Sequence, residues 1–181
     1  MELEEFLKKL ATTPEHAGLL KSVRKDAGHS KNLLLLSCID LRYPDVIHTC
    51  MEPRFHKRYD HVSLAGAGLA PVVDFGADRK PHWQQTFLEH VAISIALHSI
   101  KAVIVMDHRD CGAYQKFGLL TDQESGSKKE ATVHFQQMRR LRALLKSEFP
   151  KLAFYGILLP IEPKRDEKTG KVIGLDVELL T

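Results

Sequence analysis

A short apolar run passes directly into a turn that carries histidine, cysteine and glycine, in the sequence Val103-Ile104-Val105-Met106-Asp107-His108-Arg109-Asp110-Cys111-Gly112. A run that is apolar at successive positions is typical of a buried strand in a parallel sheet. The turn after such a strand lies at the carboxyl edge of the sheet, where α/β folds carry their sites. His108 and Cys111 could share a soft metal cation, but two ligands alone are weak evidence for a site.

A second apolar run, earlier in the chain, ends in similar chemistry. Residues 32–37 contain four consecutive leucines and lead into Cys38-Ile39-Asp40-Leu41-Arg42. If both runs are parallel strands of one sheet, Cys38 and His108 lie at the same edge of it. Together with Cys111 they supply two thiolates and an imidazole, a ligand set that suits Zn²⁺ and leaves a fourth position for water or substrate.

Asp40 and Arg42 form a second candidate pair beside this ligand set. Extended backbone would place both side chains on the same side as Cys38, because the three residues alternate along the chain. A neighbouring guanidinium keeps a carboxylate ionised and can hold it with two parallel hydrogen bonds. Asp40 could therefore accept a proton from a water at the metal, or swing inward and become a displaceable fourth ligand. The alternative is a plain ion pair at a strand end.

The rest of the chain alternates predicted strands with predicted helices. Strands are predicted over residues 32–37, 60–64, 102–106 and 152–159, and helices over 44–57, over 83–96 and around 138–145. This alternation predicts an α/β fold, with a mostly parallel central sheet flanked by helices. A final strand over 172–179 is expected to be antiparallel at the edge of the sheet, and residues 71–81 are expected to form an inserted loop.

The length and composition set the broad class of protein. The 181 residues are 44% hydrophobic and 27% charged, as expected for a globular protein. We predict an N-terminal helical arm over residues 1–30 and a single zinc-binding α/β domain over 31–181. The formal charge is only +3 and the basic residues form no stripe along the sequence, so a nucleic-acid partner is not expected. No apolar segment has the length of a membrane span, and the three widely spaced cysteines indicate free thiols in a reducing compartment, the cytoplasm.

The two motifs together resemble those of the β-class carbonic anhydrases. In that family Cys-x-Asp-x-Arg follows one apolar strand and His-x-x-Cys-Gly follows another, as at Cys38 to Arg42 and His108 to Gly112 here. The surrounding sequence is also similar. The similar segments are the Pro-led helix start at Tyr43-Pro44-Asp45-Val46-Ile47, the segment Phe87-Leu88-Glu89-His90-Val91, and the closing strands between Tyr155 and Lys171. The resemblance extends from about Lys31 to the C-terminus.

The resemblance implies a zinc-dependent lyase that interconverts CO2 and bicarbonate through a zinc-bound hydroxide. It implies that zinc is held by three residues and assisted by a catalytic pair, and that the chain works as a homodimer or higher homo-oligomer. The implied ligands are Cys38, His108 and Cys111, and the implied catalytic pair is Asp40 with Arg42. His29, at a position where many members carry a substrate-binding glutamine, and Gly112 are expected to contact the substrate.

One departure from the family leaves other functions open. Leu64-Ala65-Gly66-Ala67-Gly68 stands where the family usually carries Arg-Asn-x-x-Asn. This difference motivates a second hypothesis, a non-catalytic zinc-binding protein that resembles the carbonic anhydrases. Hydrolysis of CS2 or COS on the same scaffold is a third hypothesis, because it needs the same metal chemistry behind a more apolar entrance. Thiol redox chemistry is the weakest, since the chain has no Cys-x-x-Cys pair.

Overall fold

The computed structural model of the chain describes residue 5 and residues 33–55, 59–74 and 80–180. The predicted N-terminal arm and His29 therefore lie outside the described residues, apart from Glu5. A five-stranded sheet forms the centre, in the order β2-β1-β3-β4-β7. Its strands are β1 (Leu33–Ser37), β2 (Tyr59–Ser63), β3 (Ala102–His108), β4 (Ala153–Leu159) and β7 (Glu178–Leu179).

The first four strands of this sheet are parallel, and β7 pairs antiparallel with β4. The predicted fold class is therefore confirmed. Ser37, the last residue of β1, lies opposite Met106 of β3. This register brings the residues that follow β1 to the edge of the sheet at which β3 ends.

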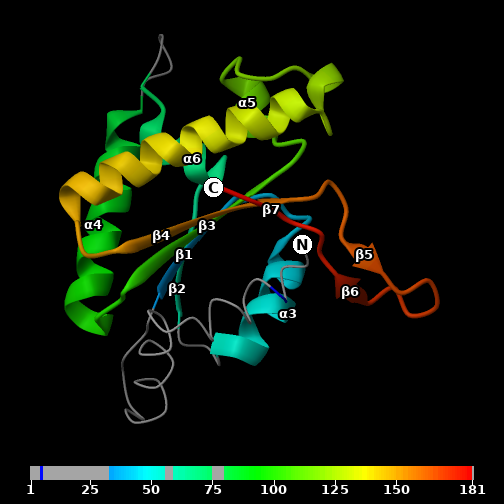
Figure 1. Cartoon of the computed structure of the whole chain (residues 1–181), viewed down its shortest axis with the longest axis horizontal. Coiled ribbons are helices and arrows are strands. Elements are labelled where there is room, and N and C mark those ends of the chain that lie inside the picture. The colour runs from blue at the N-terminus through cyan, green and yellow to red at the C-terminus, as the bar shows by residue number, and fades with distance from the viewer. Residues whose placement is uncertain (1–4, 6–32, 56–58, 75–79, 181) are drawn as a thin grey trace.

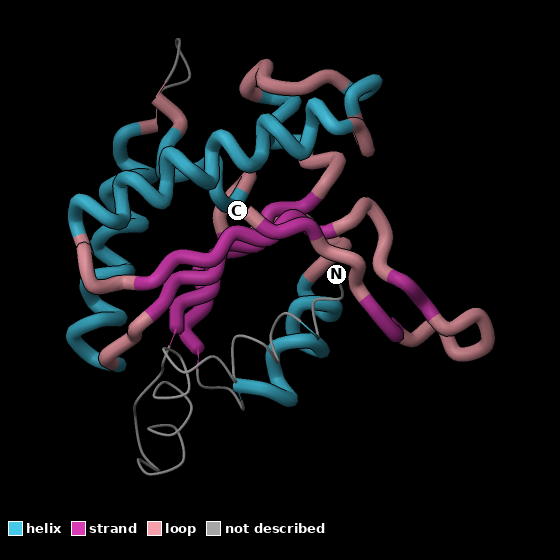
Figure 2. The backbone as a smooth tube through the Cα atoms, viewed as in Figure 1, coloured by secondary structure: helices cyan, strands magenta, loops and turns pink. Residues whose placement is uncertain are grey.

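Helices cover both faces of the sheet, as Figures 1 and 2 show. One face lies under α4 (Pro81–His98) and α6 (Lys128–Glu148), and the other lies against α3 (Pro44–Phe55). Leu33 and Leu35 pack on the α3 side, whereas Leu34 and Leu36 pack on the side of α4 and α6. Burial of both faces explains why β1 has leucine at four successive positions. Of the helices in the described part of the chain, none combines the length and the apolar character needed to cross a membrane.

The segment 71–81, which was expected to be an inserted loop, is helical at both of its ends. Pro71 and Val72 close a 3-10 helix, η1 (Ala67–Val72), and every residue of η1 is buried. η1 lies against the sheet and against α4 and α6, so its apolar side chains have a surface to pack on. The expectation of a loop was therefore wrong for Pro71 and Val72, and also for Pro81, which begins α4.

The predicted final strand over 172–179 is divided in two. β6 (Val172–Gly174) pairs with β5 (Lys164–Arg165) in a separate two-stranded sheet, and only Glu178 and Leu179 join the central sheet. Between them Leu175 and Val177 are buried in the core on the α3 side. The prediction of one continuous strand was wrong, because these two side chains cover a face of the sheet. The antiparallel direction at the edge is confirmed.

Candidate metal centre

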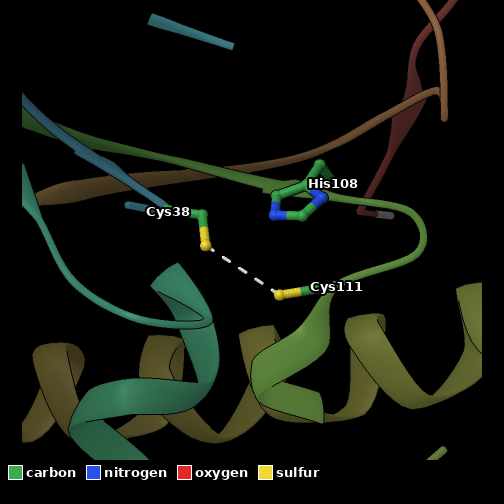
Figure 3. A group of neighbouring side chains, drawn as sticks. All are labelled: Cys38, His108 and Cys111. Carbon is green, nitrogen blue, oxygen red and sulfur yellow. Dashed lines mark hydrogen bonds between the residues drawn. The ribbon is translucent and has the colours of Figure 1, made fainter. Parts of the chain in front are cut away.

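Three predicted ligands converge at the carboxyl edge of the sheet, as Figure 3 shows. Cys38 directly follows β1, His108 ends β3, and Cys111 precedes α5 (Gly112–Lys116). One ligand atom from each lies within 4.8 Å of the other two, and the two sulfurs are 3.9 Å apart. Zinc–sulfur bonds of about 2.3 Å at a tetrahedral angle place two sulfurs roughly 3.8 Å apart. The spacing of the two thiols therefore fits zinc.

The imidazole of His108 is fixed in the orientation that a metal ligand needs. Its Nδ1 lies 2.8 Å from the carbonyl oxygen of Arg109, which can only accept, so Nδ1 carries the proton and Nε2 offers its lone pair. Nε2 is buried and has no hydrogen-bonding partner in the structure as described. The ring packs on Tyr43 with centroids 4.6 Å apart, and the Tyr43 hydroxyl donates to Pro160 O at 2.8 Å. A buried lone pair held rigidly toward two sulfurs fits a bound cation.

Hydrogen bonds stabilise a thiolate at Cys38. The thiol of Cys111, together with the Gly66 N–H that lies 3.3 Å from Cys38 Sγ, lowers the pKa of Cys38 well below its ordinary value although burial opposes the change. The hydrogen bond to Cys38 and burial raise the pKa of Cys111. A cation between the two sulfurs would stabilise both as thiolates, because a metal ion is the largest local charge in such a site.

Asp40 and Arg42 form the two-pronged pair that the sequence suggested. Arg42 Nε lies 3.0 Å from Asp40 Oδ1 and Nη2 lies 2.9 Å from Oδ2, while the Arg42 backbone N–H donates to Oδ1 at 2.9 Å. These hydrogen bonds lower the pKa of Asp40 below its ordinary value. Asp40 Oδ2 also lies 3.8 Å from His108 Nε2. The carboxylate therefore faces the convergence point of the three ligands.

The segment Leu64 to Gly68 contacts the site through its backbone. Gly66 has φ +78° and directs its N–H to Cys38 Sγ, and the Gly68 N–H donates to Asp107 Oδ1 at 2.7 Å. The positive φ favours glycine at position 66. The polar contacts of Leu64 to Gly68 with the site therefore come from backbone amides, because the side chains of this segment are small or apolar.

Gly112 is the first residue of α5, and a Cβ added to it would meet nothing within 4 Å. Open space beside it leaves room for a small ligand, and its role in substrate binding stays a prediction.

Several supporting residues had no signal in the sequence. The buried Glu130 accepts from the backbone N–H of Asp110 at 2.5 Å, from Gly126 N–H at 2.7 Å and from Arg109 Nη1 at 2.9 Å. His134, which had no visible partner in the sequence, hydrogen-bonds Asp107. Glu130 and His134 lie on α6, 20 or more residues along the chain from Arg109, Asp110 and Asp107, so no local spacing could have identified these contacts.

Comparison with known proteins agrees with this fold. A family model described as "Putative carbonic anhydrase" matches residues 28–159. An uncharacterized protein of Rickettsia bellii (strain RML369-C) is 35% identical over 130 residues, covering 71% of this chain and 76% of that protein. Another, of Rickettsia conorii (strain ATCC VR-613 / Malish 7), is 33% identical over 130 residues, covering 71% and 67%.

A solved structure shares the fold at low sequence identity. It is one of two tetrameric β-carbonic anhydrases from the filamentous ascomycete Sordaria macrospora, with a TM-score of 0.51, 12% identity, and coverage of 96% of this chain and 89% of that one. At this identity the likeness concerns the fold. The resemblance carried by the two motifs is confirmed by the family match, which spans both of them. The chain therefore belongs to this carbonic anhydrase family, as a divergent branch with the β-carbonic anhydrase fold.

Proposed function

We propose that this protein is a zinc-dependent lyase that interconverts CO2 and bicarbonate. The observation that supports it most directly is the convergence of Cys38 Sγ, Cys111 Sγ and the unpartnered His108 Nε2. These three residues would hold the zinc. When bound, zinc would act as a Lewis acid and lower the pKa of a water at the fourth position.

Asp40 would orient the reacting water in this proposal. Because Arg42 lowers its pKa, Asp40 is a weak base but a strong hydrogen-bond acceptor at neutral pH. Its Oδ2, 3.8 Å from His108 Nε2, is close enough to the ligands to accept a hydrogen bond from the water and so direct a lone pair toward CO2. The proton that the reaction releases would then pass to buffer. Arg42 would act through Asp40 by fixing its orientation.

Stopped-flow measurement of CO2 hydration tests this function. Zinc-loaded protein should accelerate hydration, and Cys38→Ser should lose both the metal and the rate, because a ligand is removed. Asp40→Asn should keep about one equivalent of zinc and lose most of the rate. A wild-type rate no faster than that of Cys38→Ser would overturn the proposal.

A closed, non-catalytic zinc site is the second candidate. The distance of 3.8 Å between Asp40 Oδ2 and His108 Nε2 favours it, because a small movement of the carboxylate would make it the fourth ligand. The absorption spectrum of cobalt-substituted protein separates the two cases. In an open site the d–d bands should change with pH and with added bicarbonate. Bands that respond to neither would support the closed site.

Hydrolysis of CS2 or COS would use the same ligands behind an apolar entrance. Ile39 and Leu41, which flank Asp40 in sequence, are 65% and 88% exposed. Release of sulfide from CS2 or COS, compared with the CO2 hydration rate of the same preparation, distinguishes this activity from the proposed one.

We also propose that the chain forms a homo-oligomer. Ile39 and Leu41 are exposed, and Ile93 and Leu97 on α4 are 56% and 66% exposed. Ile93 and Leu97 are four residues apart and so lie on one face of α4, and the solved structure that shares the fold belongs to a tetrameric β-carbonic anhydrase. Light scattering of the purified protein should give at least twice the 20.5 kDa mass of one chain, and the mass of a monomer would contradict the proposal.

A further inference from the structure

A buried carboxylate next to His108 has no part in the proposed reaction. Asp107 is 1% exposed and lies on the opposite face of β3 from His108, because successive side chains of a strand alternate. Its Oδ1 accepts the Gly68 N–H at 2.7 Å, and its Oδ2 accepts the Tyr114 hydroxyl at 2.6 Å and His134 Nδ1 at 2.9 Å. A charge buried this deeply is tolerated because three donors satisfy it.

Two of the three donors, Gly68 and Tyr114, belong to elements next to a proposed metal ligand, and Asp107 itself adjoins the third ligand in sequence. Gly68 is in η1, directly after the turn whose Gly66 N–H donates to Cys38 Sγ at 3.3 Å. Tyr114 is in α5, and its backbone N–H donates to the carbonyl of Cys111 at 3.0 Å. Asp107 itself precedes His108. One carboxylate therefore connects the backbones that position all three ligand side chains.

The contacts around Asp107 leave little room for movement. A Cβ at Gly68 would stand 3.1 Å from Asp107 Oδ1 and 3.2 Å from Val105 Cγ1, so the short hydrogen bond depends on glycine at position 68. The rings of Tyr114 and His134 pack with their centroids 3.8 Å apart, and both residues are fully buried. A change in length of the hydrogen bond to Gly68 or to Tyr114 would therefore shift a backbone that lies next to a proposed ligand.

We propose that Asp107, through Gly68, Tyr114 and His134, is a positioning residue that sets the spacing of Cys38, His108 and Cys111 for the metal. This inference rests on the metal site of the proposed function, though not on its activity. A network that served stability alone would contribute to the free energy of unfolding and leave the geometry of the metal unchanged. A positioning network changes the affinity for metal and the ligand field.

The test uses cobalt as the probe and compares variants of the full chain. Asp107→Asn removes the charge at nearly constant shape, and Tyr114→Phe removes a single donor and should fold even where Asp107→Asn does not. Leu145→Ala is the control, because Leu145 lies on α6 with His134 but packs in the apolar core. For each protein we would measure the thermal midpoint, the cobalt dissociation constant by competition, and the thiolate charge-transfer and d–d bands.

We expect Asp107→Asn and Tyr114→Phe to weaken cobalt binding by about 10- to 100-fold, as removal of outer-shell partners does, and to shift the d–d bands. Leu145→Ala should lower the thermal midpoint and keep the affinity and spectrum of the wild type. Wild-type affinity and bands in both network variants would overturn the proposal. A wild-type chain with no thiolate charge-transfer band would overturn the metal site and this inference together, whereas cobalt binding without CO2 hydration would overturn only the proposed activity.

Discussion

Arg42 and Asp110 join the two loops of the candidate metal centre. Arg42 Nη1 lies 3.1 Å from Asp110 Oδ2, and Nη2 donates to the Asp110 carbonyl at 2.8 Å. Arg42 belongs to the loop after β1, and Asp110 lies between the two proposed ligands His108 and Cys111. The same guanidinium holds Asp40 with two nitrogens. Arg42 thus orients the proposed catalytic carboxylate of Asp40 and links it by hydrogen bonds to the loop between His108 and Cys111.

Replacement of Arg42 by lysine should reduce activity without removing the metal. Lysine keeps the charge but cannot hold Asp40 and Asp110 together with a planar fork. Loss of charge-assisted hydrogen bonds worth about 1.5–3 kcal/mol corresponds to a decrease in kcat/KM of roughly 10- to 150-fold. Arg140→Lys is the matched control, because Arg140 pairs with Asp74 at the surface. An unchanged kcat/KM in Arg42→Lys would contradict the role of the guanidinium.

The backbone at Asp110 predicts an order of stability among variants. Asp110 has φ +56°, a left-handed conformation that aspartate and asparagine tolerate better than alanine. Asp110→Ala should lower the free energy of unfolding by about 1–2 kcal/mol more than Asp110→Asn. Both variants lose the ion pair with Arg42, so their difference reports the backbone conformation together with the hydrogen bond that the asparagine amide oxygen can still accept. Urea denaturation measures it, and equal losses would mean that the conformation of this residue contributes nothing.

Glu130 should be needed to hold the loop between His108 and Cys111. The carboxylate is 1% exposed and accepts from Arg109 and from two backbone N–H groups. Glu130→Gln keeps the shape but turns an amide NH2 toward donors, so we expect a loss of about 2–3 kcal/mol in the free energy of unfolding. Glu124→Gln is the control. Glu124 closes a capping box at the surface, a position where glutamine serves equally well, and the change should stay within about 0.5 kcal/mol.

The convergence of Cys38, His108 and Cys111 could be predicted from the sequence because the fold rule that brings them together is simple. Leu33 to Leu36 and Val103 to Met106 are apolar throughout, which indicates strands buried on both faces and hence parallel pairing. Parallel strands end at one edge, so the residues after them meet. This meeting of the two loops follows whatever the number of residues between the two strands. A separate rule, the alternation of side chains along extended backbone, predicted Asp40 and Arg42 on the side of Cys38.

The supporting residues could not be predicted, because their partners come from elements without a fixed spacing. Asp107 interrupts an apolar strand, which suggests a buried polar contact, but nothing local identifies His134 or Gly68 as its partners. The division of the final strand had a similar cause. Leu175 and Val177 alternate with Asp176 as strand residues do, yet they leave the sheet because the α3 face needs apolar cover.

The pair of Asp40 and Arg42 also predicts a dependence of stability on pH. Because Arg42 lowers the pKa of Asp40 in the folded chain, the pair contributes stability above the unfolded pKa of about 3.9. That contribution disappears as the pH falls through the lower, folded pKa. In zinc-free protein, the difference in unfolding free energy between wild type and Asp40→Asn should therefore be constant from pH 7 to about 5 and vanish in stronger acid. A difference that grows on acidification would contradict the sign of the pKa shift.

Gly156 on β4 packs closely against Met138 and against the end of the chain. A Cβ at this position would stand 2.7 Å from Met138 Sδ and 2.9 Å from Leu180 Cβ. The thioether of Met138 is flexible and can move, but the Leu180 N–H donates to Gly156 O at 2.9 Å, so Leu180 Cβ moves only if the end of the chain shifts.

Gly156→Ala should therefore lower the free energy of unfolding by about 1–3 kcal/mol through overpacking. Gly112→Ala supplies the contrast, since a Cβ there meets nothing within 4 Å and restricts the unfolded chain. It should leave the free energy of unfolding unchanged or raise it by up to about 1 kcal/mol. If Gly156→Ala were as stable as the wild type, the last residues would have to adjust freely, and β7 would not be held against β4 by the packing described.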